Sequence, residues 1–112
     1  MSANEVSSTA AAQAGSGRLT LADGGRAELQ GALSFHTVTA LLKAGEEAIR
    51  QGRADVIDLS GVTASDSAGL ALLIEWLSLA KAAGRELRYQ NIPAQLTQLA
   101  RLSELEPLLG AT

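Results

Sequence analysis

Apolar and polar positions alternate twice near the start of the chain. Residues 18–22 and residues 26–33 each place apolar side chains at alternate positions, and Asp23-Gly24-Gly25 between them is a turn signal. A period of two is typical of strands that bury one face, and a short glycine-containing turn joins such strands into a hairpin. The first predicted elements are therefore the two strands of a β-hairpin.

A helical period follows the hairpin. Apolar residues recur at spacings of three and four from Val38, which predicts a helix through about Arg50. Ser34 or Thr37 is placed to cap the start of this helix, and Gly52 ends it.

A short apolar run at residues 55–59 is bounded by Asp and Gly, which indicates a strand covered on both faces. A turn rich in Ser and Asp comes next. After it we expect a second helix from Gly69 to Ala83, with Gly84 as its left-handed cap.

The apolar positions of this second helix cover too much of its surface. A surface helix in a small domain needs an apolar stripe of a little over about 100°, and this one spans roughly twice that. Part of it is therefore expected to face a partner or a third helix. One side holds Leu70, Leu73, Ile74 and Leu77, and an adjacent side holds Leu72, Trp76 and Leu79.

Trp76 has two interpretations. Core packing is usual for an aromatic residue on an apolar helix, whereas an interface anchor is the sharper alternative. We favour the anchor, because Trp76 lies with Leu72 and Leu79 off the side assigned to the core.

The second half continues with a strand at residues 86–90, Pro93 at the first helical position, a third helix at residues 94–102 and a Leu-rich tail at residues 105–109. The order is β-β-α-β-α-β-α with two strand–helix–strand crossovers. It predicts an α/β fold with a mixed four-stranded sheet flanked by helices.

Residues 1–17 are rich in Ser, Ala and Gly and hold no large apolar side chain except Val6. They predict a flexible N-terminal tail, with a short amphipathic helix that docks on a partner as the alternative. Residues 18–112 are then a single domain, because 112 residues suffice for one core and not for two.

Composition narrows the classes of function. The net charge is -3 and the 9 basic residues are scattered, which argues against a nucleic-acid partner. With no Cys and a single His, the chain is poor material for a metal site, and we expect no metal and no cofactor. No apolar run reaches the roughly 18 residues of a membrane span, and no secretory signal starts the chain. We therefore expect a cytoplasmic protein without direct membrane insertion.

The stretch Asp66-Ser67-Ala68-Gly69 is the only concentrated polar constellation. Asp66 or Ser67 caps the following helix in one interpretation. In the other, the Ser67 hydroxyl is a regulated contact with a partner, at a place where the helix dipole tolerates a phosphate. The two are compatible. A hydrolase nucleophile at Ser67 is disfavoured, because G-x-S-x-G is missing and His36, a surface or cap residue, has no evident orienting acid. No catalytic residue is assigned.

The run from Ile57 to Val62 and the run from Asp66 to Leu73 together resemble a STAS domain. This fold is shared by anti-sigma factor antagonists and the cytosolic ends of sulfate transporters. Residues 79–84 and 96–102 resemble the MlaB-type members of the family, which are small subunits of a bacterial ABC system that moves phospholipid between the outer and inner membranes. The resemblance extends from about residue 18 to residue 109.

Two branches of that family differ at Ala68. In anti-sigma factor antagonists the residue directly before the Gly is a serine that a partner kinase phosphorylates, and Ala68 has no hydroxyl. Ser67 matches the hydroxyl residue that MlaB-type proteins keep after the Asp. This departure favours the transporter subunit over an antagonist that binds an anti-sigma factor kinase, and it leaves phosphorylation of Ser67 open.

The resemblance implies a non-catalytic subunit that binds an MlaF-like ATPase and, through it, an MlaE-like permease. Such a subunit is peripheral at the inner membrane and supports outer-membrane lipid asymmetry. Rival hypotheses are the antagonist, an enzyme using Ser67, and a domain that self-associates across a two-fold axis. The residues expected to meet the ATPase are Thr63, Ser65, Asp66, Ser67, Leu72, Trp76 and Leu79.

Overall fold

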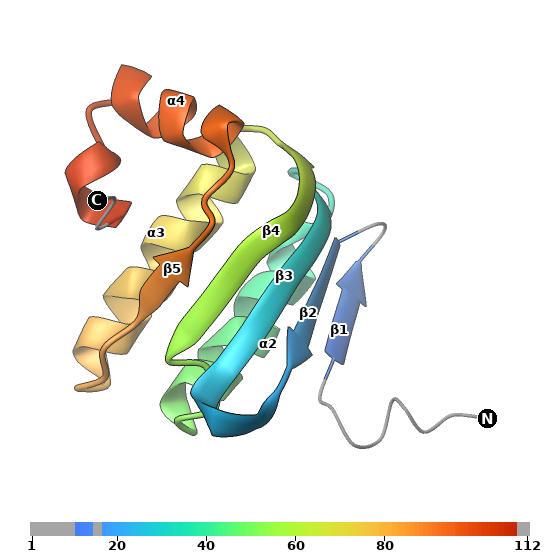
Figure 1. Cartoon of the computed structure of the whole chain (residues 1–112), viewed down its shortest axis with the longest axis vertical. Coiled ribbons are helices and arrows are strands. Elements are labelled where there is room, and N and C mark those ends of the chain that lie inside the picture. Colours follow the sequence, from blue (N-terminus) through green and yellow to red (C-terminus); the bar gives the residue numbers. More distant parts are fainter. Residues whose placement is uncertain (1–10, 15–16, 110–112) are drawn as a thin grey trace.

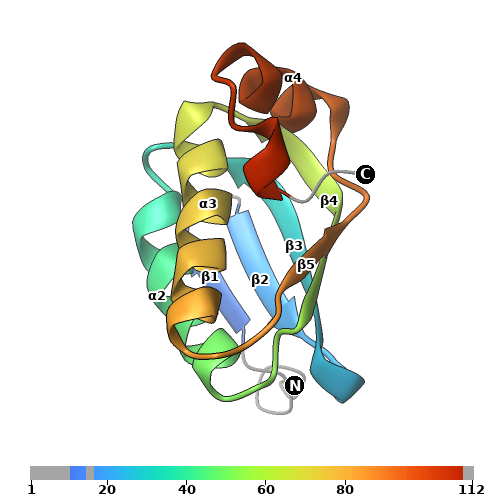
Figure 2. The ribbon, with the colours of Figure 1, turned by 90° about the vertical axis from the view of Figure 1, so that its left-hand side faces the viewer.

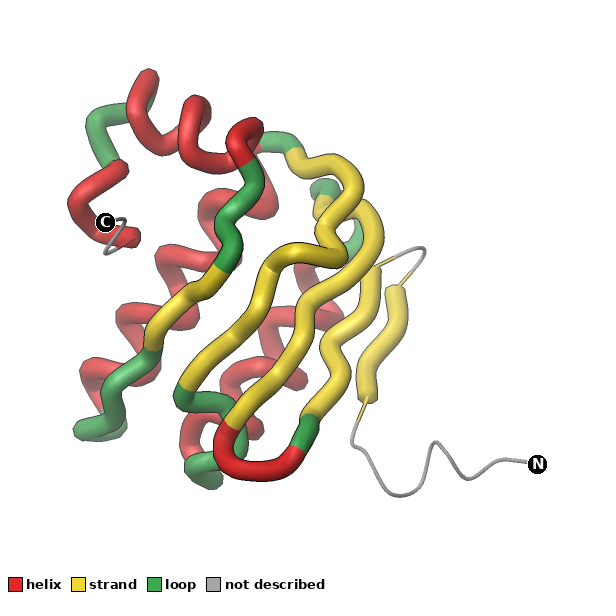
Figure 3. Tube along the Cα trace, viewed as in Figure 1, coloured by secondary structure: helices red, strands yellow, loops and turns green. Residues whose placement is uncertain are grey.

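The computed structural model describes residues 11–14 and 17–109. Its centre is a five-stranded sheet in the order β1-β2-β3-β4-β5, drawn in yellow in Figure 3. β1, β2 and β3 pair antiparallel, whereas β3, β4 and β5 pair parallel. The predicted α/β fold with a mixed sheet is confirmed. The strands are β1 (Ala11–Ala14), β2 (Gly17–Leu21), β3 (Arg26–Leu33), β4 (Val56–Ser65) and β5 (Arg88–Gln90).

Two long helices, α2 (Val38–Arg50) and α3 (Ser67–Ala82), lie on the same face of the sheet (Figure 1 and Figure 2). The crossovers from β3 through α2 to β4 and from β4 through α3 to β5 step across the sheet in one direction. Because such crossovers are right-handed, both helices must cover the same face. The remaining helices are α4 (Ala94–Leu102) and the 3-10 turns η1 (Asp23–Gly25) and η2 (Glu106–Leu109).

β4 is therefore covered on one face only, and the prediction that it is covered on both is wrong. Ile57 and Leu59 point toward the helices and are fully buried. Asp58 is half-buried and Ser60 is exposed on the opposite face. A strand with this alternation belongs to the solvated kind of sheet, in which one face packs on the core.

The strand β1 corrects the prediction of a flexible tail for residues 11–14. These residues pair with β2, for example Ala12 with Leu19, and they extend the predicted four-stranded sheet by one edge strand. A run of small residues carries neither alternation nor strong β-propensity, so only the pairing with β2 defines this strand. Residues 1–10 and 15–16 lie outside the described residues, and the prediction is not tested there.

Several element boundaries also differ from the prediction. β4 continues to Ser65, where it pairs with Leu33 of β3, so the predicted turn is much shorter and α3 begins at Ser67. β5 begins at Arg88 instead of residue 86. Pro93 has an extended backbone and precedes α4 instead of opening it.

Glycines end the first two long helices as predicted. Gly52, which follows α2, has a φ of 73°, and Gly84, which follows α3, has a φ of 70°. Glycine adopts this left-handed conformation without the steric cost that other residues meet.

Trp76 lies between α2 and α3 and is 0% exposed. Its indole nitrogen donates a hydrogen bond to the backbone carbonyl of Leu42. A Cβ at Gly45 of α2 would overlap the Trp76 ring, so the glycine allows the two helices to approach. Leu72 is also almost fully buried, although it lines a groove between the same two helices. Trp76 is therefore packed in the core, the first of its two interpretations, because α2 covers its side of α3.

The helix α4 closes one end of the sheet, beyond β4 (Figure 2). Leu96 and Ala100 are its fully buried side chains. The side-chain oxygen of Gln95 accepts a hydrogen bond from the backbone nitrogen of Ser65 at 3.2 Å, which ties α4 to the end of β4.

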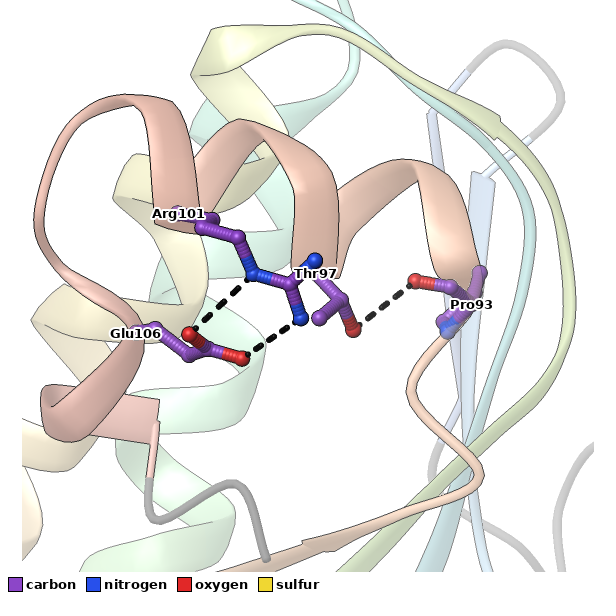
Figure 4. A network of polar contacts seen from close by, with 4 residues as sticks. All are labelled: Pro93, Thr97, Arg101 and Glu106. Carbon is purple, nitrogen blue, oxygen red and sulfur yellow. Dashed lines mark hydrogen bonds and ion pairs between the residues drawn. The ribbon is translucent and has the colours of Figure 1, made fainter.

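Side-chain contacts hold η2 against α4. The guanidinium of Arg101 on α4 donates to both carboxylate oxygens of Glu106 on η2, at 3.4 and 3.1 Å. At the start of α4 itself, the Thr97 hydroxyl donates to the carbonyl of Pro93 at 3.3 Å (Figure 4). Leu109 at the end of η2 is buried. None of the helices in the described part of the chain is long and apolar enough to cross a membrane.

Candidate partner-binding site

The corner between β4 and α3 contains the polar stretch that the sequence singles out. Asp66 has an extended backbone, and its carboxylate accepts a hydrogen bond from the backbone nitrogen of Ala68 at 2.8 Å. This contact satisfies one of the free N–H groups at the helix start. The predicted cap is therefore confirmed, and Asp66 is the residue that provides it.

Gly69 lets α3 start close against the ends of two strands. A Cβ at this position would overlap the Ser65 hydroxyl and come within 2.8 Å of the Leu33 Cβ. The backbone nitrogen of Asp66 also donates to the carbonyl of Leu33 at 3.1 Å. The corner is thus fastened directly to the end of β3.

Ser65 belongs to the predicted contact set, but the structure buries it. It is only 7% exposed, and its hydroxyl donates to the carbonyl of Asp66 at 3.0 Å. A side chain that is buried and hydrogen-bonded within the fold is not available to a partner.

The other polar residues of the predicted set are exposed. Thr63, Asp66 and Ser67 are open to solvent, with Thr63 on β4 and Ser67 as the first residue of α3. Within the described residues, no hydrogen bond of the Ser67 hydroxyl is formed. An exposed hydroxyl at a helix N-terminus lies beside free N–H groups and the positive end of the helix dipole.

The loop between β3 and α2 lies next to this corner. Thr37 is buried, and its hydroxyl oxygen accepts from the backbone nitrogen of Ser34 at 2.9 Å and lies 3.2 Å from the carbonyl of Ala32. Thr37 stands at the helix cap position, but its side chain bonds backward into the loop and not to the helix. The predicted side-chain cap of α2 is therefore wrong, because the hydroxyl is used to hold the loop.

Phe35 projects from this loop and is 75% exposed. Its ring meets that of His36 edge to face, with centroids 6.0 Å apart. His36 is exposed, as expected for a surface residue. Phe35 is not among the predicted contact residues, although this only Phe of the chain lies in a polar turn, outside both neighbouring apolar periods.

A groove of about 320 Å³ lies between α2 and α3, beside the corner. Its one charged lining residue is Glu75, which is exposed. Leu79, the third apolar residue of the predicted contact set, is half-buried and does not line the groove. The groove is lined by Val38, Thr39, Leu42, Ala68, Ala71, Leu72 and Glu75.

The corner, the loop and the groove together form one surface. It offers an exposed hydroxyl, the carboxylates of Asp66 and Glu75, and an apolar depression between two helices. Within the part of the chain that the structure describes, no group of three or more His, Asp or Glu residues could hold a metal ion. The arrangement fits recognition of another macromolecule, since specific interfaces combine an apolar centre with a polar rim.

Solved structures with the same fold include two of SpoIIAA. The chain is similar to the anti-sigma factor antagonist SpoIIAA in its unphosphorylated form, with 18% identity and a TM-score of 0.60 over 77% of this chain and 82% of that chain. It is also similar to SpoIIAA, a Bacillus cell fate determinant, in the phosphorylated form, with 20% identity and a TM-score of 0.62 over 82% and 86% of the two chains. At these identities the likeness is one of fold.

No curated protein matches the chain. The family described as "Mlab, STAS domain" matches residues 20–110, which is most of the sequence. The match includes the β4–α3 corner, both helices that line the groove, and α4. The chain therefore belongs to the MlaB-type STAS domain family.

Proposed function

We propose that this protein is a non-catalytic subunit that binds the ATPase of a bacterial ABC transporter for phospholipid and supports the activity of that ATPase. The observation that carries the proposal is the exposed Asp66-Ser67 corner beside the apolar groove, in a domain of the MlaB-type family. The ATPase is the direct partner, and the permease is reached through it. The protein then acts at the inner membrane without inserting into it, and it serves the lipid asymmetry of the outer membrane.

The composition of the surface supports this partner. Val38, Leu42 and Ala71 supply apolar area in the groove, and Asp66 and Ser67 form a polar edge at the start of α3. A small desolvated apolar centre with a polar rim is what a specific protein interface needs. These residues replace Trp76 as the source of apolar contact area.

Ala68 favours the transporter subunit over the anti-sigma factor antagonist. The residue directly before Gly69 is an alanine whose side chain lines the groove, and an alanine cannot accept a phosphate. The antagonist stays as the alternative because Ser67 presents an exposed hydroxyl at a helix N-terminus, where a phosphate is electrostatically favoured.

Affinity purification tests the two functions against each other. The tagged full chain is purified from its native host in mild detergent, and the bound proteins are identified by mass spectrometry. An ABC ATPase recovered with its permease supports the proposal. Recovery of a kinase-like anti-sigma factor instead would overturn it in favour of the antagonist.

A matched pair of variants links the result to this surface. Ser67→Arg introduces a bulky charge at the corner, and Gln98→Arg introduces the same charge at an exposed position of α4. We expect Ser67→Arg to lose the ATPase and Gln98→Arg to retain it, with both variants folded by circular dichroism. Equal recovery of the ATPase by both would show that the corner is not the contact.

A further inference from the structure

We propose that the groove between α2 and α3 receives an amphipathic helix of the partner that carries Lys or Arg beside its apolar side chains, and that Phe35 is the main anchor of this contact. The inference rests on the proposed function, because it names the kind of ATPase segment that this surface binds. It depends on three observations: the exposure of Phe35, the shape of the groove, and the charge at its edge.

Phe35 is an exposed aromatic residue on a rigid support. The large apolar residues exposed in the described part of the chain are Phe35, Leu102 and Leu108. Of these, only Phe35 is in the turn that leads into α2, three residues before the groove residue Val38. The hydrogen bonds of Thr37 hold its loop. A loop whose backbone is already held loses little conformational entropy on binding, and aromatic residues are frequent among interface hot spots.

The groove has the form that a helix fills. Two helices border it, and the lining residues recur along each at spacings of three or four, as Val38 and Leu42 do on α2 and Ala68 and Ala71 do on α3. Side chains with this spacing form ridges, and a third helix can lay its own ridge between them. An amphipathic helix in an apolar groove is a recurring mode of protein recognition.

The charge at the groove indicates a basic occupant. Glu75 lines it and Asp66 stands at its end, and both carboxylates are exposed. The ion pairs within the described residues use Glu46, Asp55 and Glu106, so neither carboxylate at the groove is paired there. Lys43 of α2 is exposed and does not line the groove. Complementary charge on the partner would be positive.

Photocrosslinking in the native host tests which segment binds. Benzoylphenylalanine is placed at position 35 and, as the control, at position 102, where Leu102 is 83% exposed on α4. We expect position 35 to crosslink to a helical segment of the ABC ATPase with apolar residues at helical spacing and at least one Lys or Arg. Position 102 should give no such product. A crosslink from position 35 to an acidic or extended segment, or no crosslink at all, would overturn the inference.

Binding measurements with the purified ATPase test the anchor residue Phe35 and the charge of Glu75 separately. Phe35→Ala should weaken the affinity by about tenfold or more, as hot-spot truncations do, and Leu102→Ala should leave it within about twofold. Glu75→Lys should weaken binding, and Glu47→Lys, the same exchange at an exposed position of α2 outside the groove, should not. Reversing the crosslinked basic residue to Glu should restore binding to Glu75→Lys.

The two proposals fail in different ways. If the ATPase co-purifies but Phe35→Ala and Glu75→Lys behave like their controls, the docked helix is wrong and the ATPase-binding function stands. If position 35 crosslinks to a basic amphipathic helix of another class of protein, and Glu75→Lys weakens that complex, the docking inference stands and the ATPase assignment fails.

Discussion

The indole nitrogen of Trp76 lies 3.1 Å from the backbone carbonyl oxygen of Leu42 and donates a hydrogen bond to it across the contact between α3 and α2. The ring itself is fully buried and fills the space above Gly45. The one tryptophan of the chain is therefore part of the core, and it sets the spacing of the two helices whose outer surfaces border the groove.

Replacing Trp76 should affect stability and not partner recognition. Trp76→Ala removes a buried aromatic side chain and should lower the free energy of unfolding by about 3–5 kcal/mol. Urea denaturation followed by circular dichroism measures this loss. Leu102→Ala, at an exposed site, should change it by less than about 0.5 kcal/mol. If Trp76→Ala kept its full stability but no longer bound the ATPase, Trp76 would instead be an interface anchor.

Gly69→Ala tests the close approach of α3 to the strands. The added Cβ would meet the Ser65 hydroxyl and would come within 2.8 Å of the Leu33 Cβ, which can move away only if the backbone shifts. We expect a loss of about 1–3 kcal/mol in the free energy of unfolding, which is typical of overpacking. Ser67→Ala, two residues earlier and exposed, is the matched control. Thermal melts of the two variants compare them directly, and equal melting temperatures would refute the close approach.

Substitutions at Ser67 should act on binding in proportion to their size. Ser67→Ala removes a single hydrogen-bonding group and should weaken the ATPase complex by about 0.5–1.5 kcal/mol. Ser67→Arg places a long charged side chain at the corner and should weaken the complex far more. Isothermal titration calorimetry with the purified ATPase measures both. Two variants that bind like the wild type would remove Ser67 from the interface.

Tyr89 should make the folded protein less stable at alkaline pH. Its hydroxyl donates to the carbonyl of Leu73 at 2.6 Å, and burial raises its pKa well above the ordinary value near 10. Above pH 10 the unfolded chain releases this proton while the folded chain retains it. The unfolded state then binds fewer protons, so the free energy of unfolding falls as the pH rises from about 10 through the folded pKa.

Absorbance at the phenolate band tests this prediction directly, since Tyr89 is the only tyrosine. We expect its ionisation to coincide with alkaline unfolding. In Tyr89→Phe the fall of stability above pH 10 should be shallower, although the variant is less stable at pH 7 because it lacks the hydrogen bond to Leu73. A Tyr89 that titrates near pH 10 in the folded protein would contradict the buried hydroxyl.

Local signals were sufficient for most elements. The alternation of β2 and β3, the helical period of α2 and the left-handed glycines after α2 and α3 are properties of neighbouring residues, and the structure agrees with them. The Asp66 cap is also local, because its carboxylate bonds to a nitrogen only two residues away. Such contacts leave a pattern in the sequence whatever the rest of the fold does.

Contacts between distant segments left no such pattern. β1 is a strand because β2 pairs with it, and β4 extends to Ser65 because β3 continues beside it. In the sequence alone, Ser65 is typical of a polar turn. It is buried because Gly69 and Leu33 pack close to it in the fold. The exposure of Phe35 follows from where its loop is held, which depends on Thr37 and on the neighbouring corner.

The residue pattern was enough to predict the order of the main elements, the polar corner at the start of α3, and the excess of apolar surface on that helix. What covers this excess depends on how the helices pack against each other. Two right-handed crossovers place α2 beside α3 on the same face, and Gly45 admits the Trp76 ring between them. The partner surface that we propose therefore comprises the groove and Phe35 instead of Trp76, since an apolar side chain binds a partner only where the fold itself has not already buried it.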